Sequence, residues 1–366
     1  MEGIMNTKSL KFGMVTVVII LAIFSHKGLC QSYPVIDLDK VTVIELPEIS
    51  PEKNPLRDGL PYFNDIVAIK SKSITPYMTG YISGRNAISI LKGTVFVDLE
   101  KKISAYDLES ANEITNENKP FQYRYKVFEF QKKKLHQSLL GTSYNVINYL
   151  SSIDQITGDT LWIKQGRYLT VCQATTVSYV SDFIIDNKTG EELFKLNSSK
   201  RLGISHVKED NGFLYLMSIN RPKSELIALN LNKGEVAWRI QGNFNAFLID
   251  ETRIYTSNQC AIDKSTGKLI WSNNSEVWIV GVVGNYLIGS KYLAEYDPVV
   301  FVYNKDTGKL AANLWSDNEF CSDCLGYGPC SPEFVFAEQG EGNRTAALVQ
   351  CSDGVYLYTF EVVGEN

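Results

Sequence analysis

Short strand-like segments recur along the chain, and Phe213 to Ile219 and Ile249 to Tyr255 are two examples. Side chains that alternate with a period of two residues are typical of β-strands. Tyr (20) and Phe (17) are frequent, and aromatic residues favour pleated, half-buried surfaces over helices. The pattern therefore predicts an all-β chain.

A six-residue turn pattern repeats between the predicted strands. In each copy an apolar strand ends at Asp or Asn, Gly follows, and a large apolar side chain comes shortly afterwards. The copies are residues 185–190 before Phe194, 229–234 before Trp238, 262–267 before Trp271 and 303–308 before Leu310. A weaker copy at 106–111 has Ala111 in place of the glycine. A repeat of this kind predicts an array of similar units.

Each residue type in the repeat has a physical reason to be there. The carboxylates of Asp186 and Asp263 can accept a hydrogen bond from their own backbone two residues on. Glycine then takes the positive φ that a tight hairpin requires, which assigns a structural role to the repeat glycines, Gly190, Gly234, Gly267 and Gly308. The aromatic four residues after the glycine, such as Trp238 and Trp271, is expected to wedge between neighbouring sheets.

The spacing of the repeat predicts a β-propeller of four-stranded antiparallel blades. Its glycines are 44, 33 and 41 residues apart, in the range of one blade per repeat. A degenerate blade is expected near 123–140, and Thr157-Gly158 is interpreted as a turn within the blade that ends at Gly190. We expect residues 41–46 and 355–363 to pair and close a ring of seven blades, within a range of six to eight.

One copy of the repeat identifies a superfamily. Residues 263–271, Asp-Lys-Ser-Thr-Gly-Lys-Leu-Ile-Trp, resemble the repeat of pyrroloquinoline-quinone-type (quinoprotein) β-propellers, and the resemblance extends over about residues 180–315. That superfamily includes quinoprotein alcohol dehydrogenases and the propeller lipoprotein of the outer-membrane assembly machinery. Its dehydrogenases bind Ca²⁺, stack the quinone on a tryptophan and often carry two adjacent cysteines. This shorter chain has no adjacent cysteine pair, so we expect a non-enzymatic member.

The N-terminus carries the pattern of a secretory signal peptide. Lys8 and Lys11 precede the apolar run from Met14 to Phe24, and Cys30 follows. The run is shorter than the about 20 apolar residues of a membrane span, so cleavage after residue 30 is favoured over anchoring. Lipidation at Cys30 is not favoured, because Leu29 is larger than the residue that this modification prefers. We expect a signal peptide over 1–30, an N-terminal strand and proline-rich connection over 31–75, and the propeller over 76–366.

Net charge and cysteine content limit the partners. The formal charge of −5 argues against general binding of nucleic acid. The six cysteines after the signal peptide are disulfide candidates in an oxidising compartment; they are Cys172, Cys260, Cys321, Cys324, Cys330 and Cys351. A zinc site in the 321–330 cluster is the alternative. The same segment, with Tyr327 among its glycines, is a candidate recognition loop.

No catalytic, cofactor or metal residue stands out in the sequence. His136 and His206 are isolated, and no nucleophile-elbow motif is present. We therefore expect an exported, periplasmic, cell-surface or extracellular scaffold, without a cofactor, that binds a protein or a glycan through loops on one face. The alternative is a quinone- or metal-dependent oxidoreductase with its site in the central channel.

Overall fold

The computed structural model describes residues 34–45, 66–75, 88–99, 102–114, 124–138, 141–166, 170–199, 202–220, 223–243, 245–257, 260–273, 277–292, 298–314, 333–351 and 354–362. Within these residues every regular element is a β-strand except η1 (Leu38–Lys40), a single 3-10 turn. The predicted all-β class is therefore confirmed.

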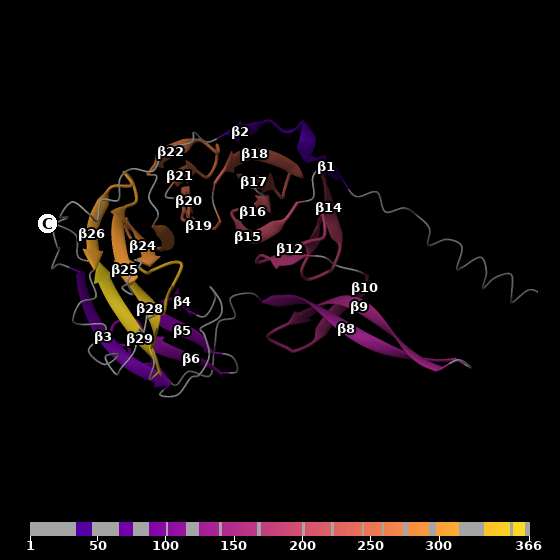
Figure 1. Ribbon diagram of the computed structural model, residues 1–366, viewed down its shortest axis with the longest axis horizontal. Helices are drawn as coiled ribbons and strands as arrows, with labels where there is room; N and C mark the ends of the chain where they lie inside the picture. Colours follow the sequence, from indigo (N-terminus) through magenta and orange to yellow (C-terminus); the bar gives the residue numbers. More distant parts are fainter. Residues whose placement is uncertain are drawn as a thin grey trace, which may run out of the picture.

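The described strands form seven sheets that follow one another around an arc (Figure 1). The first contains β4 (Ile88–Leu91), β5 (Thr94–Leu99), β6 (Lys102–Asp107) and β7 (Glu113–Ile114). The second contains β8 (Tyr125–Ser138), β9 (Gly141–Asp154) and β10 (Thr160–Gln165). The third contains β11 (Val171–Gln173), β12 (Val177–Val180), β13 (Phe183–Asp186) and β14 (Glu192–Asn197).

The remaining four sheets repeat the same order of antiparallel neighbours. The fourth contains β15 (Ile204–Asp210), β16 (Phe213–Asn220), β17 (Lys223–Asn230) and β18 (Glu235–Gly242). The fifth contains β19 (Phe247–Ile249), β20 (Arg253–Thr256), β21 (Cys260–Asp263) and β22 (Leu269–Ser272). The sixth contains β23 (Trp278–Val283), β24 (Tyr286–Tyr292), β25 (Pro298–Asn304) and β26 (Leu310–Leu314), and the seventh β27 (Glu333–Phe336), β28 (Arg344–Cys351) and β29 (Gly354–Val362).

Three strands near the N-terminus join sheets that are distant in sequence. β1 (Val35–Asp37) pairs in parallel with β14, and β2 (Val43–Glu45) pairs in parallel with β18. β3 (Ile66–Thr75) pairs antiparallel with β29, from Val362↔Ile66 to Val355↔Thr75. The predicted pairing of residues 41–46 with 355–363 is therefore wrong. β29 is nine residues long, and the ten-residue β3 can cover it, whereas β2 has three residues.

The expectation for Thr157-Gly158 is also wrong. Gly158 lies between β9 and β10, in the second sheet, and its N–H donates to the carbonyl of Asp154 at 2.8 Å. It is therefore a repeat turn in its own right. The next copy follows after only 32 residues because β11, β12 and β13 have only three or four residues each. The sheet expected near residues 123–140 is present and extends to Gln165.

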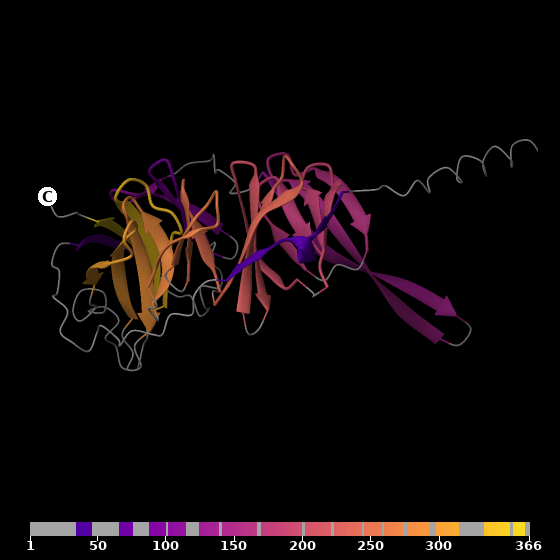
Figure 2. The ribbon, with the colours of Figure 1, turned by 90° about the horizontal axis from the view of Figure 1, so that it is seen from above.

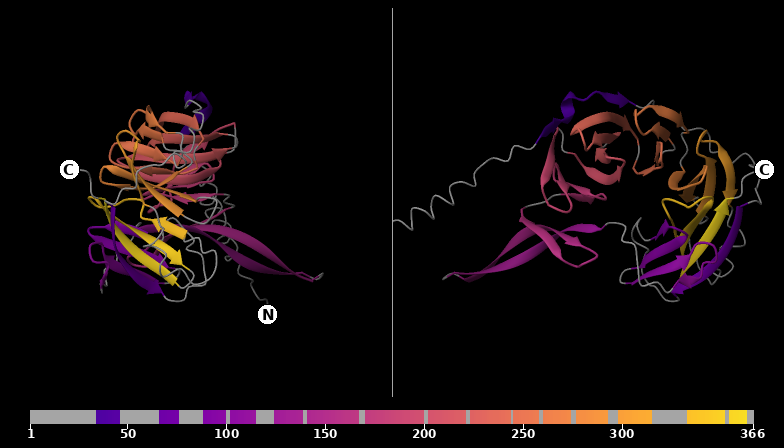
Figure 3. Two further views of the ribbon diagram at one scale, coloured as in Figure 1. Left: turned by 60° about the vertical axis from the view of Figure 1, so that its left-hand side comes forward. Right: turned by 180° about the vertical axis from the view of Figure 1, so that it is seen from behind.

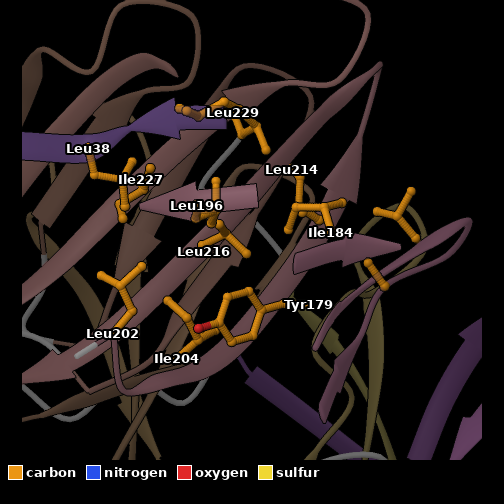
Figure 4. Packing of buried hydrophobic residues seen from close by; sticks show 13 residues of the cluster. Leu38, Tyr179, Ile184, Leu196, Leu202, Ile204, Leu214, Leu216, Ile227 and Leu229 are labelled. Atoms are coloured by element: carbon orange, nitrogen blue, oxygen red, sulfur yellow. The ribbon is translucent and has the colours of Figure 1, made fainter. Parts of the chain in front are cut away.

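Alternating side chains of one strand enter two different cores. In β16, Leu214 and Leu216 pack with the third sheet, whereas Tyr215 and Met217 pack with the fifth. The same division continues in β17, whose four central residues, 226–229, are all fully buried. A sheet covered on both faces needs apolar residues at successive positions. Figure 4 shows the core between the third and fourth sheets, with Leu38 of η1 packed into it.

Six clusters of buried residues connect the described sheets in series. They join the second sheet to the third and so on to the seventh, and the seventh to the first. Within the described residues, no such cluster joins the first sheet, β4–β7, to the second, β8–β10. One boundary of the arc therefore differs from the other six, and it is adjacent to the longest strands of the molecule.

Candidate binding site

The Asp and Asn residues of the repeat hold their own turns. Asp186 accepts hydrogen bonds from the backbone N–H groups of Lys188 and Thr189 at 2.8 and 2.6 Å. Asp263 accepts from the N–H of Thr266 at 2.7 Å and also from both neighbouring hydroxyls, those of Ser265 and Thr266, each at 2.7 Å. These hydroxyl donors hold the pKa of the Asp263 carboxyl below its usual range.

Each repeat glycine lies against an aromatic ring of the preceding sheet. Gly190, Gly234, Gly267 and Gly308 all have positive φ, and an added Cβ would lie 2.5–2.8 Å from the rings of Trp162, Phe194, Trp238 and Trp271 respectively. The indole N–H of Trp238 also donates to the carbonyl of Lys264 at 3.1 Å, and that of Trp271 donates to the carbonyl of Lys305 at 2.9 Å. These glycines and aromatic rings therefore connect neighbouring sheets.

A charged network across the fourth to sixth sheets includes a lysine from each of two repeat turns, Lys264 and Lys305. Lys264 donates to Asp210 at 2.6 Å and to the carbonyl of Asp250 at 2.8 Å. The Asp250 carboxylate accepts from Tyr255 at 2.8 Å and lies 3.4 Å from the Lys305 ammonium. Every member has a partner, so the network ties neighbouring turns together. It offers no open carboxylate for general acid–base chemistry.

The predicted cysteine residues are only partly described. Cys172 and Cys260 are free thiols, so neither forms the disulfide for which it was a candidate. Burial raises the pKa of both thiols, which lowers their reactivity. Cys321, Cys324, Cys330 and Tyr327 lie outside the described residues, as does the side chain of Cys351. The part of the chain that the structure describes contains no group of three His, Cys, Asp or Glu side chains placed to hold a metal ion.

The second sheet differs from the others in what covers its faces. Val127 and Leu150 are buried against Val180 and Ile185 of the third sheet. The opposite face carries Phe128, which is only half-buried. Exposed Ile163 of β10 lies on the same face, because it pairs with Ser151 and Ser151 pairs with Phe128. Its exposed fraction is 51 %.

Three aromatic rings form a continuous surface on this face. The Phe128 and Phe130 ring centroids are 6.0 Å apart, and the Phe130 ring stacks on Tyr149 at 5.3 Å with an interplanar angle of 13°. The Lys132 ammonium lies over this pair, 5.6 Å from the Phe130 centroid and 5.4 Å from the Tyr149 centroid. We call Phe128, Phe130, Tyr149, Lys132 and Ile163 the aromatic face.

The strands that carry the aromatic face continue far beyond the sheet. β8 and β9 pair over fourteen positions, from Tyr125↔Asp154 to Ser138↔Gly141, whereas β10 pairs only with residues 149–153. Figures 1 and 2 show this hairpin projecting from the arc, and both views in Figure 3 show it directed away from the other sheets. We call residues 129–150 of this hairpin the ribbon.

The aromatic face has the composition of a protein-binding surface. Aromatic side chains are enriched at interfaces and supply much of their binding free energy. Sequence reasoning missed it, although Phe128 and Phe130 alternate with Glu129 in a pattern typical of a half-exposed strand. The contribution of Tyr149 depends on the register of β9, and no local sequence signal specifies that register.

Comparison with known proteins gives only distant structural similarities. No protein-family model and no curated protein matches the sequence. The structure is similar to that of BamB from Moraxella catarrhalis, with 10 % identity and a TM-score of 0.43 over 81 % of this chain and 99 % of that chain. It is also similar to a chain in the crystal structure of a mitotic checkpoint complex, with 11 % identity and a TM-score of 0.46 over 84 % and 98 %.

A third similarity is to Sqt1 from Saccharomyces cerevisiae, with 13 % identity and a TM-score of 0.42 over 74 % of this chain and 82 % of that chain. At TM-scores below 0.5, these similarities carry no argument here about fold or function. The described residues contain no helix long and apolar enough to cross a membrane.

Proposed function

We propose that the chain is an exported, non-catalytic scaffold, a seven-bladed β-propeller of the quinoprotein-repeat type, that binds a protein partner through the aromatic face and the ribbon. Seven sheets in chain order, the last of them completed by β3 from near the N-terminus, support the propeller architecture. Export rests on the signal-peptide pattern of residues 1–30, which lie outside the described residues. The protein isolated from outside the cytoplasm should then begin near Gln31.

The observation that carries the binding proposal is that, among the described residues, no buried apolar cluster joins the first sheet to the second. At the six other boundaries apolar side chains of both sheets are buried together. At this boundary the aromatic rings remain half-exposed and are displayed on a strand pair that projects from the arc. Exposed aromatic groups on a rigid scaffold are typical of sites that bind other proteins.

A shortened variant tests this proposal without removing any sheet. Because Phe130 pairs with Tyr149, residues 131–148 can be replaced by Asn-Gly, which favours a two-residue hairpin. The wild-type protein should capture a partner from an extract of its native envelope. That partner, once identified and purified, should bind the wild-type protein and not the shortened variant, while both unfold at similar temperatures.

Point variants separate the aromatic face from the ribbon as a whole. Tyr149→Ala should lower the affinity for the purified partner by roughly tenfold or more, as expected for an aromatic residue at the centre of an interface. Trp278→Ala is the matched control, because Trp278 is 59 % exposed on the sixth sheet and should leave affinity unchanged. Equal affinity of the partner for the wild-type protein and the shortened variant would contradict the proposal.

A further inference from the structure

The β8 edge of the ribbon has no described strand paired to it at any position, and the β9 edge has none over residues 141–148. Beyond Tyr149, β9 has no described neighbour other than β8, and β8 has no strand on its other side along its described length. A two-stranded hairpin that stands alone in water is only marginally stable. A third strand would supply hydrogen bonds and apolar contacts that the ribbon does not have.

The side chain of Gln173 identifies which backbone groups open onto the β8 edge. Its amide oxygen accepts from the N–H of Val127 at 2.9 Å, and its amide nitrogen donates to the carbonyl of Tyr125. These two residues therefore direct their N–H and C=O groups away from β9. Because alternate residues of a strand use the same edge, Glu129 and Gln131 also direct theirs outward. At Tyr125 and Val127 the Gln173 amide therefore already makes the hydrogen bonds that a neighbouring strand would make.

The charge of β8 selects the kind of strand that can pair there. β8 carries four lysines and one glutamate, so its net charge is 4 − 1 = +3 in a chain whose net charge is −5. Lysines on an edge strand discourage pairing with a neutral strand or with a second copy of itself. Pairing two copies of β8 would bring two lysine tracts together, and their like charges would repel. An acidic strand would instead be attracted to the lysines.

We propose that this edge of β8 binds an extended acidic segment of a partner protein as an additional β-strand, an inference that rests on the proposed function. Beside the part of this edge that Gln173 leaves free, the side chains on this side of β8 are Phe128, Phe130 and Lys132, each two residues apart. A strand that lies beside them satisfies this order with two apolar side chains followed by a carboxylate. The segment therefore has the pattern apolar-x-apolar-x-acidic on one face.

The test uses a defined peptide and the purified protein. A fluorescent Thr-Glu-Thr-Val-Thr-Val-Thr-Glu-Thr peptide has the required pattern in either chain direction. Its anisotropy should rise on binding, and its affinity should fall between about 50 and 500 mM NaCl because the charges are exposed. The same peptide with both glutamates replaced by lysine should not bind.

Two pairs of variants separate strand pairing from charge. Gln131→Pro removes an outward N–H without removing a hydrogen bond to β9. It should lower the affinity for the peptide by about tenfold. Gln131→Ala keeps that N–H and should bind as the wild type does. Lys132→Glu should lower the affinity for the peptide by roughly fivefold. Lys268→Glu, on an exposed turn of the fifth sheet, should leave that affinity unchanged.

Several outcomes would overturn the inference. Binding of the peptide to the variant that lacks residues 131–148 would place the site elsewhere. Binding that is insensitive to Gln131→Pro would exclude strand pairing. If vesicles of phosphatidylglycerol bind, depend on Lys132 and ignore Gln131→Pro, while the peptide does not bind, the lysines serve a membrane surface instead. If the purified partner needs the ribbon but tolerates Gln131→Pro, the proposed function stands and only the strand addition fails.

Discussion

At the scale of single residues, the repeat positions explain how one sheet is attached to the next. A glycine that lacks a Cβ lets an indole ring of the preceding sheet lie directly on the backbone of the turn. The indole N–H then reaches a carbonyl in that turn. The glycine serves two purposes, since it adopts a positive φ and also leaves space for the ring.

Two glycine substitutions separate these purposes. Gly267→Ala should lower the free energy of unfolding by roughly 2–4 kcal/mol, because it adds a contact with Trp238 to the strain of a positive φ. Gly158→Ala is the matched control: its φ is +77°, and an added Cβ would meet nothing within 4 Å. Gly158→Ala should lower the free energy of unfolding by only about 1 kcal/mol. Urea unfolding measures both values, and equal losses would show that the ring contact is unimportant.

At the scale of elements, the sheets differ in how their edges are completed. β14 and β18 are each covered by a short parallel strand, and β29 is covered by β3. The base of β8 is covered by one side chain, that of Gln173. A part-buried side-chain amide therefore takes the place at the base of β8 that a neighbouring strand takes in those sheets.

Removing this amide should loosen β8. Gln173→Ala leaves the N–H of Val127 and the carbonyl of Tyr125 without this partner, which should cost about 1–3 kcal/mol. Amide hydrogen exchange at Val127 should become faster in this variant. Gln165→Ala, on the exposed end of β10, serves as the control and should leave that exchange rate unchanged. Slow exchange at Val127 in Gln173→Ala would mean that other groups satisfy this edge.

At the scale of the whole molecule, residues 34–45 are part of the arc of sheets. Residues 34–45 cross the outside of the third and fourth sheets (Figure 2). Leu38 is fully buried in the core between them, and its carbonyl accepts a hydrogen bond from Arg239. Arg239 is held in turn by Glu225 at 2.7 Å. This segment therefore stabilises the boundary that it crosses.

A pair of alanine variants measures that contribution. Leu38→Ala should lower the free energy of unfolding by about 2–4 kcal/mol, as large-to-small changes in a packed core do. Ile44→Ala changes a partly exposed residue of β2 and should cost less than about 1 kcal/mol. Chemical denaturation of both variants decides the point. Similar small losses would mean that residues 34–45 rest on the surface without contributing to the core.

The sequence predicts the turns better than it predicts the pairing of strands. Asp263 and Gly267 predict their turn because the local backbone conformation and hydrogen bonding require those residue types. The strand that pairs with β29 was misassigned, because alternation shows that a segment is extended and does not show which neighbour it takes. Gly158 was assigned to the wrong sheet for a related reason: the length of the next repeat depends on strands of only three or four residues.

The binding surface shows the same limit. Phe128 and Phe130 are visible in the sequence as alternating aromatic residues, but the sequence does not show that no other described sheet packs on them. Stacking with Tyr149 and coverage by Lys132 depend on the register between β8 and β9. Such properties arise from tertiary structure, and a single sequence contains no local signal for them.

The pairing of β3 with β29 also has a consequence for the order of folding. One partner lies at residues 66–75 and the other at residues 354–362, so nearly the whole chain must be available before the two can meet. Contacts between residues so far apart in sequence form slowly, because a long loop must close first. A chain that emerges from its N-terminus onward can assemble the middle sheets early. Its seventh sheet is completed only when the last residues have emerged.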